Sequence, residues 1–185
     1  REIVTSSTYR QSSSATAEKR ALDPDNRLLA RGPRSRLPAE LIRDNALSVS
    51  GLLVNTIGGP SVRPYQPAGL WREMAKGDAA EKNYQQSHGP DLYRRGIYTF
   101  WKRSIHYPSF ALLDAPNREV CSSSRPVTIT PVQALALLND PTYVEAARCF
   151  AARIMRQADE FEGRYRAAFR AATSRFPSRD ELMLG

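Results

Sequence analysis

Prolines placed directly after helix-capping residues are the feature that most constrains this chain. Thr130 precedes Pro131 and Asp140 precedes Pro141, and an apolar segment follows each pair. A threonine or aspartate side chain accepts the free N–H groups at a helix start, and proline at the first helical position loses no hydrogen bond. The two pairs therefore predict two successive helices, one from Pro131 to about Asn139 and one beginning at Pro141.

Further helices are predicted on both sides of this pair. Pro38 starts a helix over 38–53, and its apolar residues recur at helical spacing on one side. These residues are Leu41, Ile42, Val49, Leu52 and Leu53, joined by Ala46. A later helix carries Phe161, Tyr165 and Phe169 on one face, and Ser178 with Glu181 forms a capping box for a last one. The C-terminal third is thus predicted to be helical.

Glycine and proline mark the segments between the helices. Asp23-Pro24-Asp25-Asn26 has the chemistry of a turn, and the prolines of 58–67 predict an ordered irregular loop. The aromatic segment 92–107 fits either a helical stripe or a short strand, because so short a run does not distinguish the two periods. The predicted fold class is mainly α: an irregular multi-helix domain with long ordered loops, and a short strand pair as the alternative in the aromatic segment.

The chain reads as the C-terminal part of one domain spanning 1–185. With 41% hydrophobic residues it has enough apolar material for a core. We divide it into a polar loop, helix and Gly/Pro loop over 1–71, a flexible polar excursion over 72–91, and the aromatic segment with the helical third over 92–185. It begins without Met, so we expect a fragment of a longer protein.

Arginine dominates the charge. The chain has a net charge of +8 from 27 basic and 19 acidic residues, and only four of the basic residues are lysines. The planar guanidinium suits carboxylate, phosphate or sulfate groups. Many arginines pairing with acids, or an anion-binding face, would both explain this bias. No lysine-rich stripe or nucleic-acid motif is present, so nucleic acid is not an expected partner. The apolar runs fall short of the ~20 residues that span a bilayer.

Arg36, Glu40, Arg43 and Asp44 form the first candidate site. Their spacing places them on one polar helix face, because residues three and four apart are neighbours on a helix. One interpretation is an anion or substrate site with a carboxylate in reach. The favoured one is a structural ion-pair network buried under the loop 58–67, in which the two arginines and two carboxylates neutralise one another.

The second candidate site is a ligand-stacking surface. Aromatic residues alternate with arginines in the middle of the chain, a mixture that sugars and nucleobases both use. The set comprises Tyr65, Trp71, Tyr98, Trp101 and Arg103, with Arg63, Arg94 and Arg95 nearby. The alternative is a core in which arginine stems pack over the rings.

Metal and haem sites are not predicted within this chain. Cys121 and Cys149 form no Cys-x-x-Cys-His, so c-type haem has no attachment motif here. A disulfide between the two cysteines and two buried free thiols are both open. His88 and His106 show no ligand spacing. No Gly-x-Ser-x-Gly elbow or phosphate loop is present, so the sequence leaves enzymatic activity open.

Several motifs in fixed order resemble one family, the PSD-one domain, a planctomycete-type, cytochrome-c-associated domain of unknown function. The matching segments are 7–13, 23–31, 36–44, 51–53, 58–62, 64–67, 98–103, 114–116 and 130–141. The family often has Asn before the Thr-Pro pair, where this chain has Ile129. The resemblance covers nearly the whole chain.

The resemblance implies a periplasmic or extracellular module of a multidomain protein. Its partners would be the upstream domains of the same polypeptide, and haem c would be carried on another domain. The leading hypothesis is a scaffold or recognition role beside a redox domain. One alternative is an enzyme domain acting on an anionic, sulfated polysaccharide, and the other is a purely structural module.

Overall fold

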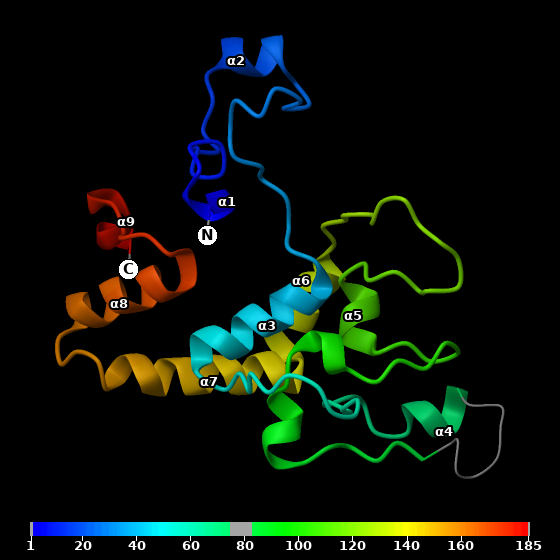
Figure 1. Cartoon of the computed structure of the whole chain (residues 1–185). Coiled ribbons are helices and arrows are strands. Elements are labelled where there is room, and N and C mark those ends of the chain that lie inside the picture. Colours follow the sequence, from blue (N-terminus) through cyan, green and yellow to red (C-terminus); the bar gives the residue numbers. More distant parts are fainter. Residues whose placement is uncertain (1, 75–82, 185) are drawn as a thin grey trace. The chain divides into compact units, whose positions relative to one another are not determined.

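The computed structural model describes residues 2–74 and 83–184, and the mainly helical fold class is confirmed (Figure 1). The helices are α1 (Glu2–Thr5), α2 (Ala17–Leu22), α3 (Ala39–Ser50), α4 (Leu70–Met74), α5 (Pro108–Leu112), α6 (Pro131–Asn139), α7 (Pro141–Met155), α8 (Phe161–Thr173) and α9 (Arg179–Leu184), with 3-10 helices η1 (Gly89–Tyr93) and η2 (Gly96–Tyr98). The chain forms two compact units, Arg1–Leu37 and Pro38–Gly185.

The first unit is organised around Asp23, which ends α2 and is buried. Its carboxylate accepts hydrogen bonds from the backbone N–H groups of Arg27 and Leu28, both at 2.8 Å. The backbone N–H of Asn26 donates to the Asp23 carbonyl, so the turn predicted at 23–26 is confirmed. The hydrogen bond from Leu28 is the main cause that lowers the pKa of Asp23, and burial opposes it.

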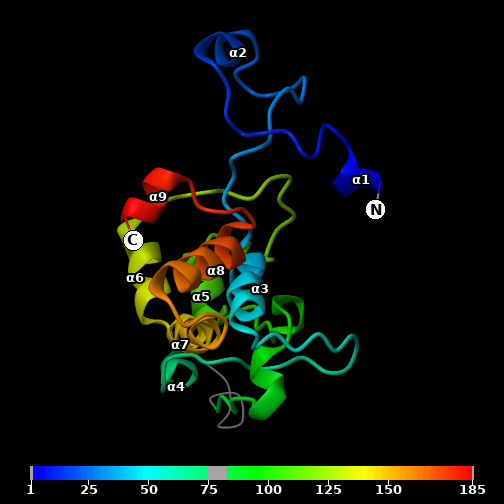
Figure 2. The same cartoon turned by 90° about the vertical axis from the view of Figure 1, so that its left-hand side faces the viewer.

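In the second unit, α3 packs against α7 (Figures 1 and 2). The core cluster combines a residue of α3, the segment around α5, and a residue of α7. Its buried members are Ala39, Tyr107, Phe110, Leu113 and Tyr143. A smaller cluster forms around Trp71 and Ile105.

The buried face of α3 differs from the predicted one. Leu41, expected in the core, is 43% exposed, whereas Leu47 is 0% exposed. The fully packed face runs through Ala39, Arg43 and Leu47, while Ile42 and Ala46 of the predicted stripe pack against the core as expected. A hydrophobicity pattern assigns an arginine to solvent, and this shifted the predicted stripe by part of a turn. The helix ends at Ser50, where Gly51 adopts φ 84° and closes it in the left-handed conformation.

The predicted starts of the C-terminal helices are confirmed. The Thr130 hydroxyl accepts from the Gln133 N–H at 3.3 Å, and the Gln133 side chain accepts from the Thr130 N–H at 3.2 Å. Asp140 caps α7 through the Thr142 N–H at 2.8 Å. Ser178 and Glu181 form the predicted capping box of α9.

The aromatic segment forms neither a continuous helix nor a regular strand. It holds η1, η2 and single bridges, of which Val54–Arg94 and Val62–Thr99 are parallel. Short 3-10 turns alternate here with extended residues, so neither period is sustained. Of the predicted excursion 72–91, residues 75–82 lie outside the described residues. Over the described ranges, no helix has the length and apolarity needed to cross a membrane.

Candidate functional site

Arg43 lies at the centre of the packed face of α3 and is 1% exposed. Its guanidinium donates to the backbone carbonyls of Leu92 at 2.6 Å and Arg94 at 2.7 Å. No carboxylate pairs with it among residues 2–74 and 83–184. Its buried charge is therefore solvated by peptide dipoles, and it fixes the segment that follows η1 against α3.

Arg94 also binds backbone carbonyls, those of the loop 56–60. It is buried, and its guanidinium donates to the carbonyls of Pro60 at 2.7 Å, Thr56 at 3.3 Å and Gly58. The guanidinium also lies 3.9 Å from the ring centroid of Tyr98, whose hydroxyl accepts from the Gly58 N–H at 2.7 Å. Arg43 therefore binds the backbone of Arg94, and the side chain of Arg94 in turn binds the backbone of the loop 56–60.

Asp44 secures the next residues of the same segment. Its carboxylate accepts from the Gly96 N–H at 2.5 Å and lies 3.6 Å from the Nε of Arg95. A Cβ at Gly96 would come within 3.0 Å of the Glu40 carbonyl oxygen, so only glycine permits this approach. The side chain of Asp44 therefore holds the segment in direct contact with the backbone of α3.

A groove of about 410 Å³ opens beside the first turns of α3. It is lined by Pro38, Glu40, Leu41, Asp44, Arg95, Ile97, Arg118 and Arg125. Arg125 pairs with Glu40 at 2.8 Å. Both carboxylates of the groove are thus engaged by an arginine, and three guanidiniums face two carboxylates.

The predicted polar face is divided by the structure. Arg43 is directed at carbonyls of 92–94, while Glu40 and Asp44 line the groove with arginines from other segments. Arg36 belongs to the first unit. The loop expected to cover the face binds Arg94 instead.

The candidate stacking residues occupy separate places. Trp71 is buried against Tyr84 and Phe100, with ring centroids at 5.2 and 5.9 Å. Trp101 packs on the α3–α5 core. Its ring lies tilted against His106, with the centroids 5.5 Å apart, and the Arg118 guanidinium covers it at 4.3 Å. Tyr98 contacts Arg94, Tyr65 is half-buried, and Arg103 is exposed.

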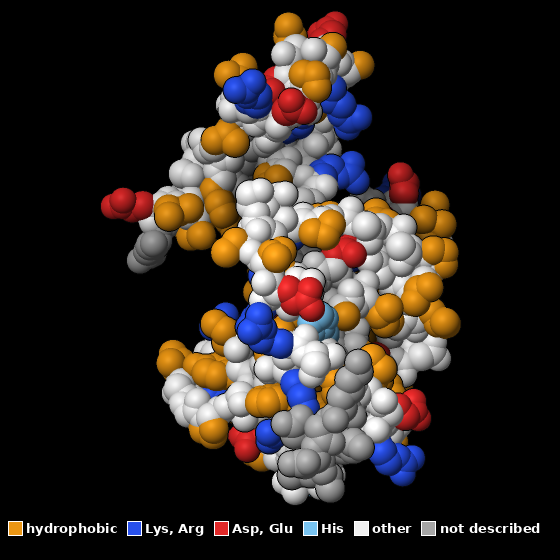
Figure 3. Space-filling view, turned by 90° about the vertical axis from the view of Figure 1, so that its right-hand side faces the viewer, with side chains coloured by type: hydrophobic (Ala, Val, Ile, Leu, Met, Phe, Trp, Pro, Cys, Tyr) orange, Lys and Arg blue, Asp and Glu red, His pale blue; other side chains and the backbone are white. Residues whose placement is uncertain are grey.

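Helix α6 buries a polar side chain and exposes apolar ones, the reverse of a usual surface helix. Its buried residue is Gln133, whose amide donates to the Thr128 hydroxyl at 2.9 Å and to Asp114 at 3.3 Å. Hydrophobic side chains face outward on and just before the helix. They are Ile129 (92% exposed), Val132 (55%), Leu135 (60%) and Leu138 (74%). We call these four residues the α6 apolar face; Figure 3 shows that hydrophobic side chains also reach the surface elsewhere.

Sequence reasoning missed the groove arginines and the orientation of α6. Arg118 and Arg125 lie in an irregular loop, where no periodicity predicts their direction. Arg94 and Arg95 follow one another beside the aromatic segment, and their sequence positions do not indicate that Arg94 is buried and Arg95 lines the groove. The capping box around Gln133 gives the start of α6, but which side of so apolar a helix is buried depends on tertiary contacts.

Titratable and metal-binding groups add little to these sites. Burial raises the pKa of Tyr107 to about 12, so this core phenol stays neutral. Cys121 is exposed and Cys149 half-buried, and both are free thiols. Among the described residues, no group of three His, Cys, Asp or Glu side chains could hold a metal ion.

The fold and these sites define a mainly helical module in which buried arginines bind the backbone of irregular segments and helix α6 exposes an apolar face. A family model described as PSD1, protein of unknown function (DUF1553), matches residues 1–184, and the chain belongs to this family. Comparison with curated proteins found no match, and comparison with solved structures found none either.

Proposed function

We propose that this chain is a scaffold and recognition module that packs, through the α6 apolar face, against other domains of its own polypeptide. The carrying observation is that α6 buries a glutamine and exposes its leucines. Exposed apolar patches on a folded protein mark interaction sites. The resemblance to cytochrome-associated domains supports a periplasmic or extracellular location and a neighbouring domain that carries haem c.

Haem itself would be held elsewhere in the polypeptide. Neither cysteine belongs to an attachment motif, and His106 lies against Trp101 within the packed part of the second unit. The residues of this chain do not fit covalently attached haem. Its role would be to position a haem domain by docking, and we derive no redox step through its own side chains.

The two alternatives receive less support. An enzyme acting on an anionic polysaccharide would need an available acid or base, but Glu40 is paired with Arg125 and Asp44 is bound by Gly96 and Arg95. A purely structural module would have no reason to expose Leu135 and Leu138.

Cysteine labelling tests the docking proposal. Leu138→Cys is introduced into this chain and into the longer polypeptide that contains it, and maleimide modification is followed by peptide mass spectrometry. We expect rapid labelling in the chain alone and at least about tenfold slower labelling in the longer protein, since docking would remove the thiol from solvent.

Two reference positions set the scale. Leu47→Cys, at a fully buried site, should react slowly in both contexts, and native Cys121 should react rapidly in the chain alone. Equal labelling of Leu138→Cys in both contexts would overturn the proposal and leave the purely structural role.

A further inference from the structure

The groove beside α3 concentrates positive charge at a place that the docking function does not use. Arg95, Arg118 and Arg125 converge on it from two segments, against the carboxylates of Glu40 and Asp44. The side chains of Arg95 and Arg125 are 46% and 42% exposed, so each keeps N–H donors directed to solvent. With three guanidiniums and two carboxylates, the groove carries a net charge of plus one.

Arg118 is the most available of the three. Within the described residues it pairs with no carboxylate, and its guanidinium rests on Trp101. Its backbone adopts φ 61°, a left-handed conformation that side chains other than glycine rarely take.

The remaining lining is aliphatic. Pro38, Leu41 and Ile97 line the same groove, and the last two are exposed. No aromatic residue lines the groove as described, and Trp101 is covered by Arg118 and His106. Aromatic faces that stack on neutral sugar rings are thus not offered here, whereas aliphatic side chains beside arginines suit a peptide that carries both apolar and acidic residues.

We propose that this groove binds an extended acidic peptide segment. Its carboxylates would take bidentate hydrogen bonds from Arg95, Arg118 and Arg125, the geometry for which guanidinium is preorganised. Apolar side chains between the acids would contact Leu41 and Ile97. Glu40 and Asp44 orient the arginines and leave one positive charge for the ligand to neutralise.

Fluorescence anisotropy at low ionic strength tests this with the whole chain. The probe is a fluorescein-labelled peptide of alternating Glu and Leu, compared with an alternating Gln and Leu peptide. We expect binding of the Glu peptide that weakens with added salt, and at least about tenfold weaker binding of the Gln peptide. Chondroitin sulfate serves as the competing polyanion.

Variants assign the binding to the groove. Arg118→Gln should weaken the Glu peptide about tenfold, whereas Arg148→Gln, an exposed arginine of α7 outside the groove, should not. Ile97→Ser should weaken it by a smaller factor and leave the salt dependence unchanged. Thermal melts establish that each variant folds.

Three results would overturn the proposal: no binding of the Glu peptide, equal effects of Arg118→Gln and Arg148→Gln, or stronger binding of chondroitin sulfate at the same groove. The last would make the ligand a sulfated polysaccharide. Docking through α6 is measured by labelling in a different context, so either proposal can fail without the other.

Discussion

Helix α3 buries an arginine, whereas helix α6 exposes leucines. On α3, Arg43 is almost fully buried because two backbone carbonyls of 92–94 accept its hydrogen bonds. On α6, Gln133 faces inward, where Thr128 and Asp114 accept hydrogen bonds from its side-chain amide. The terminal nitrogens of Arg43 and the side-chain amide of Gln133 thus both find acceptors.

The comparison shows that each of these two helices buries a polar side chain where acceptors from a neighbouring segment meet its donors. Irregular segments such as 89–107 and 113–130 carry many backbone groups that need partners. Side chains with several donors on the adjacent helices supply them.

Removing the guanidinium of Arg43 should have the largest effect. Arg43→Ala leaves the carbonyls of Leu92 and Arg94 buried without their donors and opens a cavity. We expect a loss of about 3–5 kcal/mol in the free energy of unfolding, or failure to fold. Urea denaturation measures it.

Arg148→Ala, at an exposed position of α7, provides the control and should change the free energy of unfolding by no more than about 0.5 kcal/mol. Equal stability of the two variants would break the comparison, since Arg43 would then not organise the 92–96 segment.

Leucines within α3 give the second test. Leu47→Ala removes a fully buried side chain and should cost about 2–5 kcal/mol. Leu41→Ala, at a 43% exposed position, should cost about 1 kcal/mol or less. The difference between the two urea midpoints shows which of the two leucines lies on the buried face of α3. If Leu41→Ala lost more stability than Leu47→Ala, the buried face of α3 would be the one that the apolar stripe of the sequence predicts.

These residues also indicate how much the sequence could predict. Helix starts at Thr130, Asp140 and Ser178 were predictable because caps act within a few residues. The role of Arg43 was not, since its acceptors lie about fifty positions away, at Leu92 and Arg94. The groove arginines depend on how an irregular loop returns to α3, and local propensity does not encode that.

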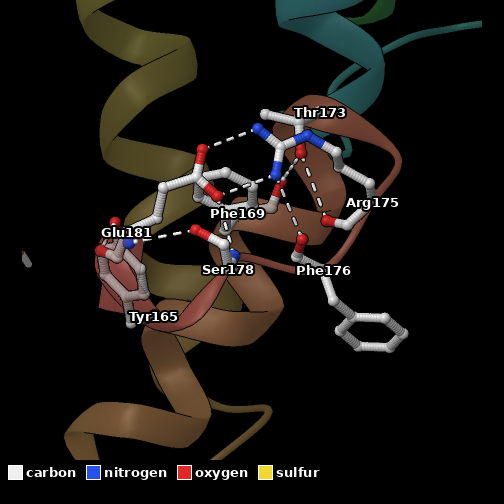
Figure 4. A network of polar contacts seen from close by, with 7 residues as sticks. All are labelled: Tyr165, Phe169, Thr173, Arg175, Phe176, Ser178 and Glu181. Carbon is white, nitrogen blue, oxygen red and sulfur yellow. Dashed lines mark hydrogen bonds and ion pairs between the residues drawn. The ribbon is translucent and has the colours of Figure 1, made fainter. Parts of the chain in front are cut away.

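The α8–α9 corner offers an exposed arginine for comparison with Arg43. Arg175 forms two hydrogen bonds with Glu181, at 2.7 and 2.8 Å, and Glu181 also caps α9 through the Ser178 N–H (Figure 4). The hydrogen bonds from Arg175, with those from Ser178, lower the pKa of Glu181 from 4.5 to about 2. Unlike the carbonyls around Arg43, this acceptor titrates.

Acid should therefore weaken this corner selectively. Because the folded pKa lies below the unfolded one, the ion pair stabilises above pH 4.5, and this contribution is lost as the pH falls toward about 2. Glu181→Gln should lower the thermal midpoint modestly at neutral pH and should lose less on acidification than the parent. Parallel pH profiles for the two proteins would show that the pair contributes nothing.

The smallest effect is expected at the α6 apolar face. Leu138→Ala removes the same atoms as Leu47→Ala, but from an exposed position. Alanine also has a high helix propensity, so the helix itself is not weakened. Since Leu138 is 74% exposed, the chain alone should lose no more than about 0.5 kcal/mol in urea denaturation. In the longer polypeptide the same change should cost more, because a docked leucine would there be buried. A loss above about 1 kcal/mol in the chain alone would mean that the α6 apolar face, and not only its opposite side, packs against its own unit. The contrast between the packed face of α3 and the exposed α6 apolar face would then disappear.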